Sequence, residues 1–455
     1  MKDSSEPFDL LMVAFEISER LNGIVEVRSE KSRRYKLTMT EDGRAQDQVN
    51  WDYGISVRHR THSNEDFFST DNLRSWSIDL NSFIERIRRR RKEDKIDETH
   101  ISSSQGKLKI GNIDFDAITE KIKPMAVDLM QIAKSNLGDN FAIQLDFQAI
   151  STIKTFTSSI GSHIVQAIPT ATMTIHLTNK SHPYNELQTM IGGNERQHLS
   201  WEKMVKTLNT LIQEAKTIPN ARTIKEPSTN LIFSHDAAWT LIHELIGHAV
   251  EKSTTHPSYL DRNEGTKIAP SMLSVIDDKG IPGVGTYGFD DEGNKASGTV
   301  IVEEGILNSF LYDQNTAIRE GTFSTGNARA PSVRQPPSVR QSNLFVESGD
   351  RNDGELFEEA KSGFFVGPSA YAFSETMRGR VTIQPQYLQR FERGELKEMY
   401  LTGQLSWDFN QIIPKLKALG KSMINHPTFC TKEGRTLGVG MLSPMMMFEE
   451  VRIRT

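Results

Sequence analysis

"FAIQLDFQAISTIKTFTSSIGSHIVQAIPTATMTIHLT", residues 141–178, carries the clearest signal of the fold. It is rich in Ile, Val, Thr and Phe, and apolar and polar residues alternate along parts of it. Such residues favour strands, and a period of two is typical of a strand with one buried face. The stretch therefore predicts strands. An amphipathic helix is expected next over residues 200–217, with Ser200 as a candidate N-cap, and then a linker over 218–230.

The residues before this stretch predict a mixed α/β region. Residues 8–21 and 73–95 have helical spacing of apolar positions, and the second of these segments runs into charge. Residues 23–44 alternate like paired strands around a turn, and residues 53–61 are another strand candidate. The polar stretch near 92–106 lacks periodicity and is a candidate sub-boundary.

The residues after the linker predict a β-rich unit. Residues 273–313 contain β-prone runs separated by D-D-x-G and E-E-G turn signals, a pattern typical of hairpins. A short P-S-V-R-Q duplication at residues 331–341 predicts an extended loop. We therefore expect an α+β fold: an N-terminal α/β region over 1–225, and a C-terminal β-rich domain over 226–455 that carries the helical segment 236–252.

Composition limits the classes of protein that the chain can belong to. A chain of 455 residues is longer than a single hydrophobic core usually serves, so more than one domain is expected. The 25% of charged residues and the net charge of -5 indicate a soluble protein with no general attraction to nucleic acid or lipid. The basic run at Arg86–Lys92 is interpreted as the solvated end of a helix, so no nucleic-acid partner is expected. There is neither a secretory signal nor a membrane-length apolar run, and the single cysteine, Cys430, cannot form an intramolecular disulfide. These features favour the cytoplasm.

"HELIGHAVE", residues 243–251, differs by one position from the H-E-x-x-H pattern of zinc peptidases. Residues four apart lie roughly 40° apart around a helix, whereas residues five apart lie roughly 140° apart. His243 and His248 therefore converge only if the helix ends or distorts at Gly247, or contains a π-bulge. Glu244 stands where the general base stands in H-E-x-x-H enzymes.

Two histidines alone do not complete a catalytic zinc site, which usually has three protein ligands and an open position for water. Chemically possible third ligands are Glu251, His256, Asp236 and Cys430. Glu251 could instead orient a histidine. The competing interpretation is a buried helix whose histidines bond to neighbouring polar groups, with Cys430 as a small buried apolar residue.

Three separated stretches together resemble one known family. They are "LIHELIGHAVE" at 241–251, the D-D-x-G, D-D-E-G and T-G-N-A-R elements within 275–330, and "FCTKEGRTLGVG" at 429–440. Their sequence, order and approximate spacing resemble the TldD/PmbA metallopeptidases. The resemblance spans nearly the whole chain and is most specific in the C-terminal half.

The resemblance implies a function and a set of site residues. His243, His248 and Cys430 would bind zinc (Zn²⁺), which their softness favours over iron or cobalt. Glu244 would be the general base. The five-residue spacing between His243 and His248 is then the spacing that is usual in the family.

The resemblance also implies substrates and partners. The expected substrate is an unfolded or extended peptide, and the expected assembly is a dimer with itself or with a metal-free paralogue. Residues 363–403 lack the triple glycine frequent in the family, in a region expected to shape the substrate cleft. The alternative is a peptide-binding or assembly subunit with a structural metal and no proteolysis.

Overall fold

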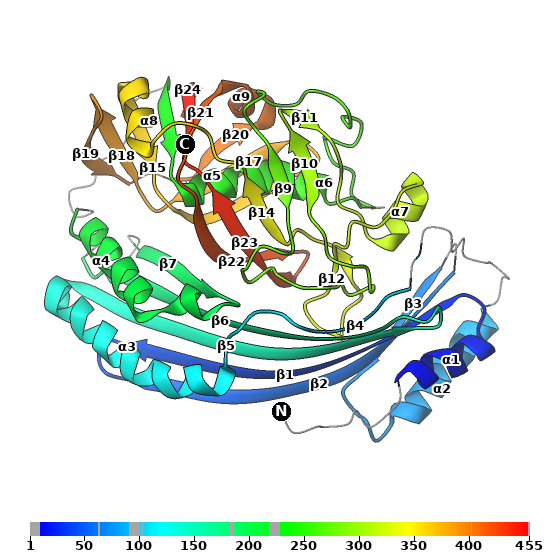
Figure 1. The fold of residues 1–455 in the computed structure, drawn as a ribbon. Helices are drawn as coiled ribbons and strands as arrows, with labels where there is room; N and C mark the ends of the chain where they lie inside the picture. The colour runs from blue at the N-terminus through cyan, green and yellow to red at the C-terminus, as the bar shows by residue number, and fades with distance from the viewer. Residues whose placement is uncertain are drawn as a thin grey trace.

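The fold was determined as a computed structural model, which describes residues 10–61, 64–90, 101, 103–181, 186–217, 228–253, 255–401 and 403–453. Residues 218–227 of the predicted linker, the charged end of the helix after Arg90 and most of the predicted sub-boundary at 92–106 lie outside these residues. The last part of the predicted linker, residues 228–230, is instead the start of a strand, β8 (Ser228–Phe233). The chain has the predicted α+β fold, with a long curved sheet in its N-terminal half and several shorter sheets in its C-terminal half (Figure 1).

The N-terminal half is built on one seven-stranded sheet, in the order β3-β2-β1-β5-β6-β4, with β7 also paired to β6. The predicted strand stretch forms β5 and β6, which run antiparallel from the pair Phe141 and Asn179 to the pair Thr157 and His163. In chain order the strands are β1 (Ile24–Thr40), β2 (Ala45–Arg60), β3 (Glu65–Thr70), β4 (Gln105–Lys109), β5 (Phe141–Ser158), β6 (His163–Asn179) and β7 (Glu186–Gly193). Because β1 pairs with β5, strands from both sides of the predicted sub-boundary share one sheet.

Four helices supply the apolar surface that covers this sheet. Two clusters of buried side chains lie against it, one formed with α1 (Leu10–Arg20) and α2 (Trp76–Arg89) and the other with α3 (Phe115–Leu137) and α4 (Trp201–Thr217). The candidate cap Ser200 accepts the Lys203 N–H at 3.3 Å, as predicted. No helix in the described part of the chain is long and apolar enough to cross a membrane.

The C-terminal half contains two six-stranded sheets, ordered β11-β10-β9-β14-β23-β22 and β19-β18-β15-β8-β24-β21, with a three-stranded sheet β16-β17-β20 and the pair β12-β13. The strands are β8 (Ser228–Phe233), β9 (Val275–Asp277), β10 (Thr299–Glu303), β11 (Ile306–Leu307), β12 (Ala328–Arg329), β13 (Ser338–Val339), β14 (Asn343–Val346), β15 (Ser362–Val366), β16 (Ser369–Glu375), β17 (Arg380–Pro385), β18 (Leu388–Glu392), β19 (Glu395–Tyr400), β20 (Leu405–Asp408), β21 (Leu416–Leu419), β22 (Ile424–Lys432), β23 (Arg435–Ser443) and β24 (Met446–Arg452). The helices are α5 (His235–Ile242), a π turn (His243–Gly247), α6 (His248–Val250), α7 (Gln314–Glu320), α8 (Asp353–Ala360) and α9 (Phe409–Ile412).

The helix that carries the motif lies inside this half. The side chains of Ala237, Leu241 and Ile242 are fully buried in one large cluster with strands of four sheets. Such burial restricts the helix to one position, so residues on it are held rigidly.

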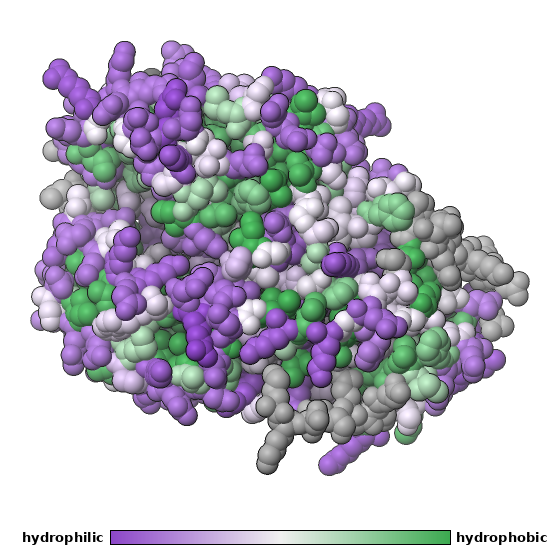
Figure 2. Space-filling model, viewed as in Figure 1, coloured by the Kyte–Doolittle hydropathy of each residue, from purple (hydrophilic) through white to green (hydrophobic). Residues whose placement is uncertain are grey.

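Buried charges and a cavity lie where the two halves meet. Arg58 of β2 forms 2.6 Å ion pairs with Glu26 of β1 and with Glu292 of the C-terminal half, and all three side chains are almost fully buried. A cavity of about 420 Å³ separates the halves elsewhere, lined by β1, β5 and β6 on one side and by residues that include Phe429 of β22 on the other. Figure 2 shows hydrophobic side chains gathered toward the middle of one face, beside a hollow between the upper and lower halves.

Candidate metal centre

The two motif histidines meet because the helix contains a π turn. Ser234 caps the N-terminus of helix α5, because its Oγ accepts the Ala237 N–H at 3.2 Å. At His243–Gly247 the helix widens, and the His248 N–H donates to the His243 carbonyl five residues earlier. The ring centroids of His243 and His248 are consequently 4.5 Å apart. Of the two distortions that the sequence left open, the helix has the π-bulge.

Gly247 matters because it has no side chain to collide with Gln341, and not because of its backbone flexibility. Its φ of -54° and ψ of -53° are ordinary helical values, so the alternative of a helix that ends or distorts at Gly247 through unusual backbone angles does not occur. A Cβ at this position would instead lie 2.1 Å from Oε1 of Gln341, far inside van der Waals contact. The glycine therefore leaves room for a buried amide beside the π turn.

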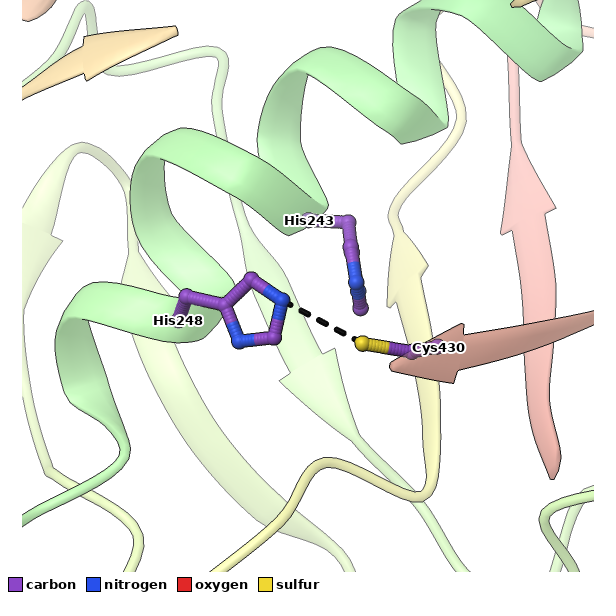
Figure 3. A group of neighbouring side chains, drawn as sticks. All are labelled: His243, His248 and Cys430. Carbon is purple, nitrogen blue, oxygen red and sulfur yellow. Dashed lines mark hydrogen bonds between the residues drawn. The ribbon is translucent and has the colours of Figure 1, made fainter. Parts of the chain in front are cut away.

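Cys430 comes from the edge strand β22 and points toward the two histidines (Figure 3). Its Sγ lies 3.3 Å from Nε2 of His248. One ligand atom from each of His243, His248 and Cys430 can be chosen so that all three lie within 4.8 Å of one another. Residues about 180 positions apart in the chain thus form one cluster of two nitrogen donors and one sulfur donor.

Glu251 orients His248 and does not belong to this cluster. Its Oε2 lies 3.0 Å from Nδ1 of His248, and its Oε1 accepts the backbone N–H of Gln341 at 3.0 Å. Lys432 donates to the same carboxylate at 2.6 Å. A carboxylate on one imidazole nitrogen fixes the ring and leaves the other nitrogen free for a metal.

The other candidate third ligands lie elsewhere. Asp236 accepts the backbone N–H of Ser369 at 2.6 Å, and His256 is exposed, with its Nδ1 at 2.8 Å from Oγ1 of Thr255. Among the four candidates that the sequence left open, Cys430 alone joins the two histidines.

His243 has two features expected of a metal ligand: a fixed ring and a buried nitrogen without a hydrogen bond. Its ring stacks on Trp239 with centroids 4.3 Å apart and planes 20° apart, which fixes its orientation. Its Nδ1 is buried and has no hydrogen-bond partner among the described residues. Buried polar atoms are rarely left in this condition. Together with the N, N and S donors, this fits a zinc ion.

The charges around the cluster favour a thiolate. Burial raises the pKa of the Cys430 thiol, but the two adjacent histidines outweigh burial and lower it to about 5. Burial lowers the pKa of His248, but Glu251 outweighs it and raises the pKa to about 10. Burial raises the pKa of Glu251, whereas Lys432, His248 and Arg340 hold it well below its ordinary value. A thiolate is the form of cysteine that binds metals.

Glu244 is partly buried and lies on the π turn directly after His243. Its negative charge is one of the causes of the raised pKa of His248, after Glu251 and Cys430. Its expected role beside a metal stays a prediction.

Sequence reasoning missed three side chains that surround the ligands: Trp239, Arg340 and Gln341. Arg340 donates to Sγ of Cys430 at 3.1 Å, and Nε2 of Gln341 lies 3.4 Å from Nδ1 of His248. Arg340 and Gln341 belong to the P-S-V-R-Q duplication, and this unusual repeat was the available signal. Lys432 lies within the C-terminal motif, but its pairing with Glu251 was not predicted either.

The family known as the PmbA/TldA metallopeptidase C-terminal domain matches residues 226–455, half of the chain. This protein belongs to that metallopeptidase family. It is 29% identical over 335 residues to a metalloprotease from Methanocaldococcus jannaschii, covering 70% of this chain and 73% of the relative. It is 28% identical over 226 residues to a zinc metalloprotease TldD homolog from Saccharolobus solfataricus, covering 49% and 51% of the two chains.

Solved structures share the whole fold. TldE from Thermococcus kodakarensis has a TM-score of 0.77 at 17% identity, covering 98% of this chain and 99% of that one. A Thermotoga maritima protein described as a candidate modulator of a DNA gyrase has a TM-score of 0.79 at 15% identity, covering 97% and 99%. The predicted family is therefore confirmed, and the relatives' names imply a peptidase that uses a metal cofactor.

Proposed function

We propose that this protein is a zinc-dependent peptidase that hydrolyses peptide bonds in unfolded or extended peptides. The observation that carries the proposal is the convergence of His243, His248 and Cys430 directly beside Glu244. Three protein donors with an acidic neighbour are the pattern of a catalytic zinc site, whereas structural zinc sites usually have four protein ligands.

Each residue has a distinct role in this proposal. The two imidazoles and the thiolate hold the zinc ion, which would polarise the scissile carbonyl and make water more acidic. Glu244 accepts a proton from the attacking water and passes it to the leaving amine. Glu251 holds His248 in the tautomer that leaves Nε2 facing Cys430.

An extended substrate has room in the cavity between the two halves, whose lining includes Phe429 of β22 but none of the three ligands. The cavity borders β22, the strand that carries Cys430, and the neighbouring Phe429 side chain is partly exposed on its wall. Main-chain hydrogen bonds to a sheet edge would hold an extended peptide with little preference for its side chains. Such a peptidase would work in the cytoplasm, as a dimer with itself or with a metal-free paralogue.

The test uses Glu244→Gln with full-length protein and casein fragments as unstructured peptides. Glu303→Gln is the matched control, because Glu303 is exposed on β10. We expect wild type and the control to contain about one zinc per chain and to cleave peptides. Glu244→Gln should retain zinc and lose activity by at least about 100-fold, the lower end of a general-base contribution.

Two outcomes would contradict this proposal in different ways. Cleavage by Glu244→Gln at the wild-type rate would remove the role of Glu244. Zinc-loaded wild type that binds the fragments without cleaving them would instead favour a peptide-binding or assembly subunit with a structural metal.

A further inference from the structure

The duplicated P-S-V-R-Q segment has two copies with different surroundings. The first copy, residues 331–335, forms a turn, and the second, residues 337–341, includes β13 and leads toward the metal centre. The predicted extended loop therefore holds for the second copy only. Each copy places one arginine: Arg334 in the first and Arg340 in the second.

Arg340 contacts the third ligand twice. Its Nη2 donates to the backbone carbonyl of Cys430 at 3.0 Å and lies 3.1 Å from Sγ of the same residue. One nitrogen thus joins the main chain and the side chain of Cys430. Since these two atoms are separated by the χ1 torsion, this double contact favours one rotamer of the cysteine.

Arg340 also lies close to Glu251, which bonds to the second ligand, His248. Its Nε lies 3.6 Å from Oε1 of Glu251, the carboxylate that holds His248. Its Nη1 donates to the Arg435 carbonyl at 2.9 Å, and the side chain is only 3% exposed. A guanidinium is planar, keeps its charge and offers five donors in a fixed fork, so it can hold several acceptors at once.

We propose that Arg340 is a positioning residue of the metal centre: it fixes Sγ of Cys430 in the ligand rotamer and ties it to the Glu251–His248 pair. This inference rests on the proposed metal binding by His243, His248 and Cys430. Its consequence is slow release of the metal, because the sulfur and the imidazole are held in place before the ion arrives. The N–H···S contact also withdraws electron density from the thiolate.

Arg334 offers a matched control within the same local sequence. It donates to Asp52 at 2.7 Å and 2.8 Å and to Asp71 at 3.1 Å, and its side chain is 37% exposed. It therefore pairs with acids of the N-terminal half. Arg334→Gln changes the same residue type in the same five-residue motif without touching the metal ligands.

The experiment compares wild type, Arg340→Gln, Arg340→Lys and Arg334→Gln as full-length proteins. One readout is the rate at which zinc passes to an excess of chelator. The other is the sulfur-to-cobalt charge-transfer band after loading with Co²⁺. Thermal unfolding confirms that each variant is folded, and Arg340→Lys preserves the charge should Arg340→Gln fail to fold.

We expect Arg340→Gln to lose zinc faster than wild type, by about 10–100-fold when the loss of affinity typical of a residue that holds a metal ligand falls on the release rate. Its cobalt band should move to lower energy, because the sulfur loses a hydrogen-bond donor. Arg340→Lys should lie in between, since an ammonium cannot reproduce the planar fork, and Arg334→Gln should match wild type in both readouts.

Zinc release and a cobalt band unchanged in Arg340→Gln would overturn this inference and leave the metal centre standing. Equal effects of Arg334→Gln and Arg340→Gln would also overturn it, because a general loss of stability would then suffice. Wild type that binds neither metal would overturn the proposed function itself, so the two failures are distinguishable.

Discussion

Gly247→Ala tests whether the π turn depends on the space that this glycine leaves. The new Cβ would lie 2.1 Å from Oε1 and 2.5 Å from Cδ of Gln341, whereas ordinary contacts begin at 3.4 Å. The Gln341 amide must therefore retreat by about 1.3 Å. Overpacking of this kind costs roughly 1–3 kcal/mol. Helix propensity acts in the opposite direction, because alanine is favoured over glycine by about 1 kcal/mol within a helix.

The net change in the free energy of unfolding is thus small, about 0–2 kcal/mol of destabilisation. Metal affinity should change more. Gln341 bonds to Glu251 through its backbone N–H, and its amide lies beside His248, so its displacement loosens the support of that ligand. We expect zinc to bind about 10–100-fold more weakly, as when residues that orient a ligand are replaced.

The assay combines a competitive zinc titration with chemical denaturation of the metal-free protein. The double variant Gly247→Ala/Gln341→Ala removes the clashing amide and keeps the backbone N–H of residue 341. The Gly247→Ala change should therefore cost less stability in the Gln341→Ala background than in wild type. Gly247→Ala that binds zinc like wild type and gains about 1 kcal/mol of stability, the full helix-propensity difference, would refute the steric explanation.

Two further predictions concern buried carboxylates. Glu251→Gln should weaken zinc binding by about 10–100-fold in the same titration, since it removes the charge that pairs with Lys432 and holds His248; unchanged affinity would exclude an orienting role for Glu251. Burial raises the pKa of Asp236 to about 6, because its effect exceeds the opposing effect of the hydrogen bonds from Ser369. The contribution of Asp236 to the free energy of unfolding is therefore greatest below about pH 4, and it falls by about 3 kcal/mol as the pH rises through 6. Denaturation at several pH values should show wild type losing stability relative to Asp236→Asn over this range, and a constant difference would contradict the shift.

Local sequence patterns predicted many of the secondary-structure elements and part of the candidate metal centre. The alternation in residues 141–178 predicted β5 and β6 because it depends only on neighbours in the chain. The five-residue spacing of His243 and His248 likewise required a distorted helix, and the π turn follows from that geometry. The sheet that joins β1 to β5 across residues 92–106 was not predicted, because pairing between distant strands leaves little local signal.

The remaining parts of the site depend on contacts between distant segments. Spacing alone left four candidates for the third ligand, and the choice of Cys430 came from the family resemblance. The reason is physical: β22 is brought to the helix by the pairing of strands that are distant in the sequence. Arg340 and Gln341 could not be assigned for the same reason. The space at Gly247 depends on Gln341, which is 94 residues further along the chain.

X-ray absorption at the zinc K-edge of purified, full-length wild type tests the metal centre most directly, since it counts the ligand atoms by element. If His243, His248 and Cys430 bind zinc, the spectrum will show one sulfur at about 2.3 Å and at least two nitrogen or oxygen neighbours at about 2.0–2.1 Å, two of them with the scattering pattern of imidazole. The sulfur should disappear in Cys430→Ser. A zinc site without sulfur in wild type, or protein that holds no zinc after loading, would contradict the proposed centre.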